Sequence, residues 1–310
     1  MRPRAWVGIG LCSALGAAGF AATALRRDPP LPGDLKGSLV LVGGGPGRET
    51  LYLRDLPSEG LRAFVRLPDA VREPAVSPDG SRVAFTTRGR VGVASVATGE
   101  TSIVTLGVDW LDSSPAWHPD GRSLAIVAAR PGALAADIHW LELGSGQGQP
   151  RRAALTDTPL LGESSPSFAR DATFVAFVRE ENLFRLDLPD RKLARLTGGF
   201  RKVSHARVLP SGRIALLWST EKEFGIDTIA PDGGGRETLR QGSVRYRTLA
   251  PSPDGRYLAA TFSYDLEFRL AEAIRLSHSE QVHILDARGS LVGVLARSWR
   301  SPWAEPSWGP

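Results

Sequence analysis

The stretch Glu73-Pro74-Ala75-Val76-Ser77-Pro78-Asp79-Gly80 is the first clear copy of a phrase that recurs along the chain. Related phrases occupy residues 114–121, 165–172, 208–212 and 250–255. A short apolar run follows each copy, as in Arg82-Val83-Ala84-Phe85. Self-similarity at intervals of about 40 residues predicts repeated supersecondary units, such as the blades of a β-propeller.

The phrase ends in residues that favour a tight turn. Pro78 presets its own φ, Asp79 can cap the turn through its side chain, and Gly80 tolerates a positive φ. Apolar runs on both sides indicate a hairpin between two buried strands. We therefore expect Asp79 and its counterparts Asp120, Asp171 and Asp254 to form turns rather than bind a metal.

The two ends of the repeat region complement each other. Residues 38–43, 50–56 and 61–67 are predicted as three strands of a blade that lacks its first strand. The C-terminal residues 305–310 match residues 114–119, where another blade begins. The sequence thus predicts an all-β fold, a six-bladed β-propeller over residues 36–310 in which the C-terminal strand closes blade one.

The repeat, with its Pro-Asp-Gly turn and the Ala-Phe strand after it, resembles the WD40-like PD40 repeat of TolB-like propellers. The resemblance covers roughly residues 36–310 and implies a propeller that binds proteins in the cell envelope. TolB itself carries a separate N-terminal α/β domain before its propeller. Only residues 28–35 separate the leader from the first repeat here, so we expect this chain to lack that domain.

The N-terminus resembles an export signal. Arg2 and Arg4 precede an uncharged segment, residues 5–25, which ends at Arg26 and Arg27. Residues 1–27 are therefore predicted to be a signal peptide or a membrane anchor, and residues 28–35 a linker. Both alternatives place the propeller outside the cytoplasm, as a periplasmic or exported protein or one anchored to the inner membrane. Cys12, the single cysteine, lies within the leader, so no disulfide is expected in the propeller.

Charge gives no sign of a nucleic-acid partner. The formal net charge is +5, but the arginines are scattered along the chain and form no basic stripe. An envelope protein is the expected partner, with a glycan or a peptide as alternative ligands. The membrane is a further partner if the leader is not cleaved. We expect the protein to be a monomer.

A candidate binding face lies in the loops that lead into each inner strand and in those between the middle strands. Aromatic and arginine side chains are frequent anchors of protein interfaces. The predicted binding residues are Asp109, Trp110, Asp112, Arg201, Lys202, His205, Tyr246, Arg247, Trp299 and Trp303. For Trp110, Trp299 and Trp303, packing within the fold is an equal alternative. Trp117, Trp218 and Trp308 are expected to pack between blades.

Residues 264–280 form an insertion in blade six. Apolar residues alternate with charged ones at short spacings, which suggests a short amphipathic helix; an extension of the hairpin is the alternative. A helix would lie over the tunnel mouth as a lid or a docking element.

The residues present give little support to an enzymatic function. The chain has no Gly-x-Ser-x-Gly nucleophile elbow. A hydrolase or lyase with a metal at the tunnel mouth would need His205, His278 and His283 to converge, although their spacing is not that of a local ligand set. We assign no catalytic residue, metal ligand or cofactor. The sequence favours a non-catalytic protein-binding scaffold of the cell envelope, with the metal-dependent hydrolase or lyase as the alternative.

Overall fold

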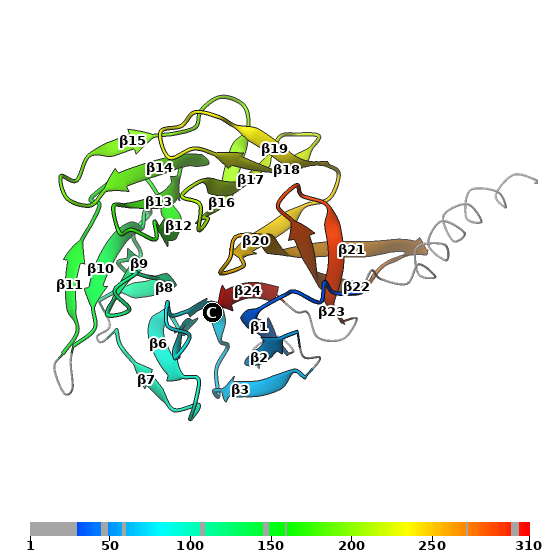
Figure 1. The fold of residues 1–310 in the computed structure, drawn as a ribbon, viewed down its shortest axis with the longest axis horizontal. Helices are drawn as coiled ribbons and strands as arrows, with labels where there is room; N and C mark the ends of the chain where they lie inside the picture. The colour runs from blue at the N-terminus through cyan, green and yellow to red at the C-terminus, as the bar shows by residue number, and fades with distance from the viewer. Residues whose placement is uncertain are drawn as a thin grey trace, which may run out of the picture.

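The computed structural model describes residues 30–44, 49–57, 60–105, 109–144, 149–158, 160–270, 272–298 and 304–310. In these residues, six four-stranded antiparallel sheets are arranged as blades in a ring (Figure 1). Each blade presents its first strand to the central tunnel. The prediction of an all-β, six-bladed propeller is confirmed.

The strands follow one another blade by blade. Blade one contains β24 (Ala304–Gly309), β1 (Gly37–Gly43), β2 (Thr50–Leu56) and β3 (Arg62–Arg66). Blade two contains β4 (Arg72–Val76), β5 (Arg82–Thr87), β6 (Arg90–Ser95) and β7 (Thr101–Ile103). Blade three contains β8 (Leu111–Trp117), β9 (Ser123–Ala129), β10 (Asp137–Glu142) and β11 (Arg151–Ala154). Blade four contains β12 (Glu163–Phe168), β13 (Phe174–Arg179), β14 (Asn182–Asp187) and β15 (Leu193–Arg195). Blade five contains β16 (Lys202–Val208), β17 (Ile214–Ser219), β18 (Phe224–Ile229) and β19 (Glu237–Gly242). Blade six contains β20 (Tyr246–Pro251), β21 (Tyr257–Leu270), β22 (Glu272–Asp286) and β23 (Leu291–Ser298).

The C-terminal strand closes the ring, as predicted. β24 pairs antiparallel with β1, with Ser38 opposite Gly309 and Leu39 opposite Trp308. The indole of Trp308 donates a hydrogen bond to the carbonyl of Lys36 at 2.9 Å. The first and last strands thus share one sheet, which leaves no open edge between them.

The Pro-Asp-Gly segments are turns, as expected. The carboxylate of Asp79 accepts hydrogen bonds from the Ser77 hydroxyl at 2.6 Å and from the Ser81 N–H at 3.1 Å. Gly80 adopts a φ of 71°, which a residue with a Cβ rarely takes. Asp254 repeats the arrangement with Ser252, at 2.6 Å.

A second constraint lies where the inner strands begin. The residue just before the repeat proline has a positive φ in four blades, at Glu73, Ser114, Ser165 and Glu305. Each strand there carries a register shift, so these residues leave the regular ladder. Their side chains can then meet the backbone of the next blade. The Glu305 carboxylate accepts the N–H of Glu73, whose own carboxylate accepts the N–H of Ser114 at 2.7 Å.

Apolar clusters fill the space between adjacent blades. Trp117 packs between blades two and three, Trp218 between four and five, and Trp308 between six and one. All three indoles are buried. The prediction that they pack between blades is confirmed.

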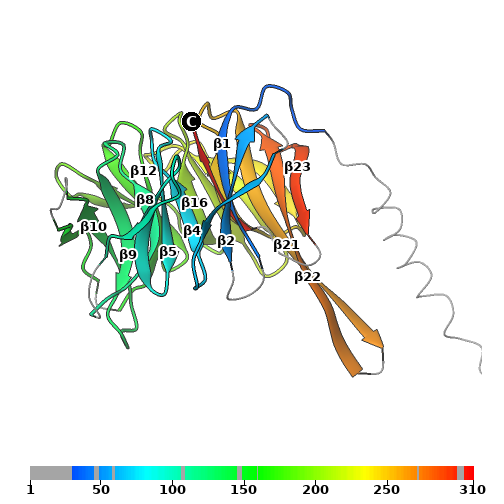
Figure 2. The same cartoon turned by 90° about the horizontal axis from the view of Figure 1, so that it is seen from below.

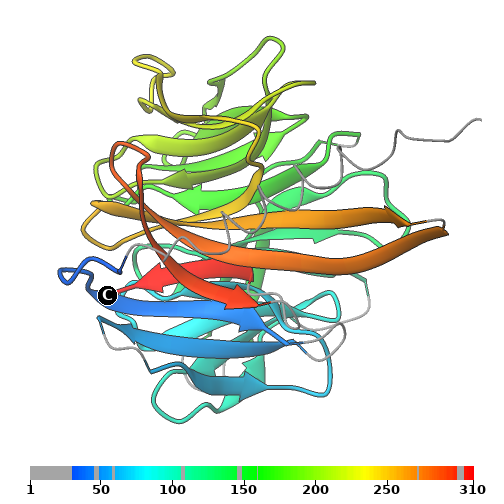
Figure 3. The ribbon, with the colours of Figure 1, turned by 90° about the vertical axis from the view of Figure 1, so that its right-hand side faces the viewer.

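The insertion in blade six is not a helix; that expectation was wrong and the hairpin alternative is correct. β21 and β22 continue their pairing to the tip, with Glu267 opposite Arg275 and Leu270 opposite Glu272. Alternation of apolar and charged residues fits a two-residue strand period as well as a short helix, and the adjoining ladder extends the strands. The hairpin projects beyond the disc and does not cover the tunnel (Figures 2 and 3).

The first described residues pack on blade six. Leu35 is buried in the cluster between blades six and one, and Leu31 packs against the same cluster. The carboxylate of Asp34 accepts a hydrogen bond from the hydroxyl of Tyr257 at 2.8 Å. This part of the expected linker is therefore attached to the propeller. The predicted leader, residues 1–27, lies outside the described residues, among which no helix is long and apolar enough to cross a bilayer.

Replacing Trp308 with alanine should destabilise the ring closure. The change leaves a cavity in place of a buried indole on β24, the strand that pairs the C-terminal end of the chain with β1. We expect the free energy of unfolding to fall by about 3–5 kcal/mol. Urea unfolding would measure it. Trp117→Ala is the matched control because its indole is equally buried but lies away from the closure. An unchanged unfolding midpoint for Trp308→Ala would contradict the shared-blade arrangement.

The turn aspartates should make the fold sensitive to acid. The hydrogen bond from Ser77 is the largest cause that lowers the pKa of Asp79 from its ordinary 3.8 to about 2. Since the folded-state pKa is depressed, the stabilisation is complete above about pH 4 and is lost as the pH falls toward about 2. Asp79→Asn should be less stable than the wild type at pH 7 and equal to it at about pH 2. Ser77→Ala should reproduce part of this effect in the same unfolding series, and a difference independent of pH would contradict the explanation.

Candidate functional site

The disc has two faces, which we name by the loops they carry. The turn face carries the Pro-Asp-Gly turns and the C-terminus. The entry face carries the loops that lead into the inner strands and the loops between the second and third strands of each blade. The β21–β22 hairpin projects on the side opposite the C-terminus, which is the entry face (Figure 2). The predicted binding residues that the structure describes lie at or near this face.

Three predicted binding residues are exposed at this face. Asp109 precedes β8, Lys202 begins β16, and Arg247 lies on β20. The ammonium group of Lys202 forms an exposed ion pair with Glu181 at 2.9 Å. Exposed ion pairs contribute little stability, so Lys202 is available to a partner.

Trp110 and Asp112 belong to one cluster on blade three. The indole of Trp110 lies edge-on to the imidazole of His139, with ring centroids 4.7 Å apart. The guanidinium groups of Arg130 and Arg152 lie 4.7 and 5.2 Å from its centroid. Asp112 is buried and pairs with Arg152 at 2.5 Å. The cluster holds Trp110 in a fixed orientation, half-buried at the entry face.

This cluster contains unpaired polar atoms. Asp112 Oδ1, His139 Nδ1 and Arg152 Nη1 are buried and have no hydrogen-bond partner within the described residues. Burial, with Arg152 as a second cause, lowers the pKa of His139, so the imidazole is neutral at pH 7. Sequence reasoning selected Trp110 and Asp112 and missed Arg130, His139 and Arg152, which come from other strands and loops of the blade.

Arg201 is held mainly within blade five. Its guanidinium lies 3.9 Å from the centroid of Trp218 and donates to the carboxylate of Asp227 at 3.0 Å. Asp227 is fully buried and also accepts from Arg236 at 2.5 Å and from the Trp218 indole at 2.6 Å. Arg201 therefore presents only part of its side chain to the entry face.

Two of the remaining predicted residues, Tyr246 and His205, are engaged with different partners inside the fold. Tyr246 is buried, and its hydroxyl lies 3.1 Å from Nδ1 of His283. His205 is buried in the tunnel wall, with Nδ1 3.1 Å from the hydroxyl of Ser165. Trp299 and Trp303 lie outside the described residues.

The histidine metal site remains a hypothesis. His205 and His283 are engaged with different partners, and the side chain of His278 lies outside the described part of the chain. No group of three histidine, cysteine, aspartate or glutamate side chains in that described part could hold a metal ion.

Four exposed apolar side chains lie on the entry face of blades three to five, and sequence reasoning missed them. Leu134 is 91% exposed in the β9–β10 loop, and Leu160 is 74% exposed in the β11–β12 loop. Phe200 is 81% exposed in the β15–β16 loop, and Leu111 is 51% exposed where β8 begins. A single apolar residue in a loop is unremarkable in sequence, and only the ring places these four on one side of neighbouring blades.

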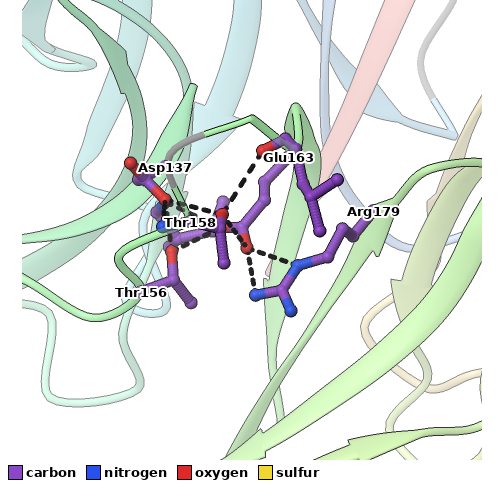
Figure 4. A network of polar contacts seen from close by, with 7 residues as sticks. Asp137, Thr156, Thr158, Glu163 and Arg179 are labelled. Carbon is purple, nitrogen blue, oxygen red and sulfur yellow. Dashed lines mark hydrogen bonds and ion pairs between the residues drawn. The ribbon is translucent and has the colours of Figure 1, made fainter. Parts of the chain in front are cut away.

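A buried polar network fixes the loop that carries Leu160 (Figure 4). Asp137 accepts hydrogen bonds from the N–H and the hydroxyl of Thr158, at 2.8 and 2.9 Å. The carboxylate of Glu163 accepts from Nε of Arg179 at 2.8 Å and pairs with its Nη2. Burial raises the pKa of Glu163, and hydrogen bonds from Thr156 and Arg179 oppose the rise. The loop thus rests on a rigid base between blades three and four.

The tunnel contains two cavities. The cavity toward the turn face is about 330 Å³ and is rimmed by turn prolines that include Pro78, Pro119 and Pro210. The cavity toward the entry face is about 210 Å³ and is lined by polar groups, among them Glu73 and His205. Arg207 lines both cavities.

Comparison with known proteins establishes the fold. No protein-family profile and no curated protein matches the chain. The solved structure of TolB from Acinetobacter baumannii is similar with a TM-score of 0.71 and 18% identity, over 96% of this chain and 71% of that one. A putative TolB from Agrobacterium tumefaciens gives a TM-score of 0.66 and 17% identity, over 90% and 100% of the two chains. The chain is thus a TolB-like propeller in fold.

The same fold also occurs in an enzyme. An oligogalacturonate lyase in complex with manganese gives a TM-score of 0.57 and 14% identity, over 85% of this chain and 76% of that one. Propellers of this shape serve unrelated functions, so the likeness does not choose between binding and catalysis.

Replacing Glu163 with glutamine should destabilise the polar network that fixes the Leu160 loop between blades three and four. The change leaves the buried guanidinium of Arg179 without a counter-charge, which typically costs about 3–5 kcal/mol. Urea unfolding would measure the loss. The double variant Glu163→Gln, Arg179→Met should recover part of it because the unpaired charge is gone. Equal stability of the wild type and Glu163→Gln would show that the pair is not a structural element.

Proposed function

We propose that the protein is a non-catalytic, extracytoplasmic propeller that binds a protein of the cell envelope through its entry face. The observation that carries this proposal is the position of Leu111, Leu134, Leu160 and Phe200. They are the most exposed large apolar side chains among the residues whose burial the structure describes, and all lie on one face of three neighbouring blades. Exposed apolar surface concentrated on one face is typical of interaction sites.

The surroundings of these side chains fit a protein interface. Such interfaces combine an apolar centre, aromatic and arginine anchors, and a polar rim. Trp110 supplies an oriented indole beside Leu111, while Asp109, Lys202 and Arg247 supply exposed charges. Trp299 and Trp303 are proposed as further members of the same face.

The location in the envelope is supported by the leader. Residues 1–27 have the charge and apolar pattern of a signal peptide or an anchor. The likeness to TolB supports the proposal at the level of the fold. A rigid disc with an apolar patch on one face suits docking of a folded partner, since little reorganisation is needed on binding.

Replacing Phe200 or Leu160 with aspartate should weaken partner binding. Truncation of an interface hot spot costs about 2 kcal/mol or more, and burying a charge there adds to this, so partner recovery should fall by about thirtyfold or more. The measurement is affinity purification of the tagged protein from crosslinked native envelopes, with quantitative mass spectrometry.

Leu193→Asp is the matched control. Leu193 is 42% exposed but begins β15 at the turn face. Its variant should retain the partner that Phe200→Asp and Leu160→Asp lose. Equal recovery with all three variants, or equal loss, would contradict docking at the entry face.

A further inference from the structure

Arg207 occupies a tunnel position at which the other blades carry small residues. It lies on the inner strand β16, opposite Ala215 of β17. The inner-strand residues at the same repeat position, directly after the repeat proline or its counterpart, are Ala75, Ala116, Ser167, Ala250 and Ser307. Blade five thus places a long cationic side chain where the tunnel is otherwise lined by alanine and serine.

The guanidinium of Arg207 forms no ion pair within the described residues, and the carboxylate of Glu73 acts on its charge only from beyond ion-pair distance. Its Nη1 donates to the Ser165 hydroxyl and to the carbonyl of Ala206, both at 2.9 Å. Within the described residues it has no carboxylate at ion-pair distance and no hydrogen bond from Nε or Nη2. The side chain of Arg207 is partly exposed. Burial by the surrounding blades is the main cause that lowers its pKa to about 10, and the charge of Glu73 opposes the shift, so the group is cationic at pH 7.

Other arginines that are largely shielded from water form ion pairs with carboxylates. Arg179 pairs with Glu163, Arg152 with Asp112, and Arg201 with Asp227. A charge that is partly withdrawn from water without an ion-pair partner is costly, so the missing ion pair at Arg207 suggests that a ligand supplies the counter-charge. The planar fork of a guanidinium suits the two oxygens of a carboxylate.

The entry-side cavity, about 210 Å³, sets the size and charge of such a ligand. Glu73 and Glu305 also line it. These two carboxylates would repel a second negative charge but would accept hydrogen bonds from hydroxyl or ammonium groups. His205 lines the same wall, and its Nε2 makes no hydrogen bond within the described residues, although the backbone of Leu249 is close enough to act on the ring.

We propose that the entry half of the tunnel binds a small organic monocarboxylate that also carries a hydroxyl or ammonium donor, with Arg207 holding its carboxylate. The donor end of the ligand faces Glu73 and Glu305. The site lies inside the ring and is independent of docking on the apolar entry face.

The test is a matched series of three-carbon acids added to the full-length protein. Lactate carries a hydroxyl, alanine an ammonium group, and propionate neither. Isothermal calorimetry should show saturable one-site binding of lactate or alanine at concentrations up to about 50 mM, and binding of propionate weaker by about tenfold. Succinate, with its second negative charge, should not bind. No saturable binding of lactate or alanine, or tighter binding of succinate or sodium sulfate, would overturn the proposal.

Arg207→Gln should abolish binding of the acid that the wild type binds. Arg207→Lys keeps the charge without the fork and should bind more weakly than the wild type. Arg170→Gln is the control: Arg170 is exposed and lines only the turn-side cavity, so this variant should bind like the wild type.

Thermal unfolding without ligand distinguishes recognition from a structural role. Removing a partly buried charge that lacks an ion pair should leave the melting temperature of Arg207→Gln equal to or above that of the wild type. A clearly lower melting temperature combined with unchanged affinity for the acid would assign Arg207 to holding Ser165 and Ala206 in place, and would overturn the proposal.

Discussion

The structure depends on the hydrogen bonds that join one inner strand to the next around the tunnel. A left-handed residue before the repeat proline offers its side chain to the backbone of the following blade, as Glu305 does to Glu73 and Glu73 does to Ser114. Such a backbone conformation costs energy and persists only where the surroundings enforce it. Here the cost is offset by the hydrogen bonds that these residues make between neighbouring blades. The pairing of β24 with β1 then makes the series a closed ring.

This arrangement explains why the entry half of the tunnel is polar while the spaces between the blades are apolar. Between sheets, apolar side chains pack in clusters, three of which contain the indoles of Trp117, Trp218 and Trp308. Toward the axis, each inner strand presents two repeat positions, namely the residue before the repeat proline and the residue after it. Blade five departs from the repeat at both positions, because His205 replaces the usual glutamate or serine and Arg207 replaces the usual alanine or serine. The least regular copy of the repeat therefore contributes the most distinctive chemistry to the tunnel.

The repeat phrase was sufficient to predict the number of blades, the Pro-Asp-Gly turns and the closing strand, since each follows from local residue chemistry at a fixed interval. It was insufficient for the insertion at 264–280, where short alternation fits both a helix and a strand and the neighbouring ladder decides.

The candidate face was predicted only in part. Asp112 and Tyr246 have the composition of binding residues but are buried by partners, Arg152 and His283, that lie far away in sequence. Phe200 carries no sequence signal, because its exposure depends on the loop that presents it.

The attachment of the first described residues orients the two faces. The segment from Leu31 to Lys36 packs where blades six and one meet, at the level of the turn that contains Asp254. The carboxylate of Asp34 accepts a hydrogen bond from the Tyr257 hydroxyl, and the carbonyl of Lys36 accepts one from the Trp308 indole. The chain therefore reaches the propeller at its turn face. If residues 1–27 are retained as an anchor, the short connection holds the turn face toward the membrane. The entry face, with its apolar side chains and its projecting hairpin, then points away from the bilayer, where a partner can approach it without competing with lipid.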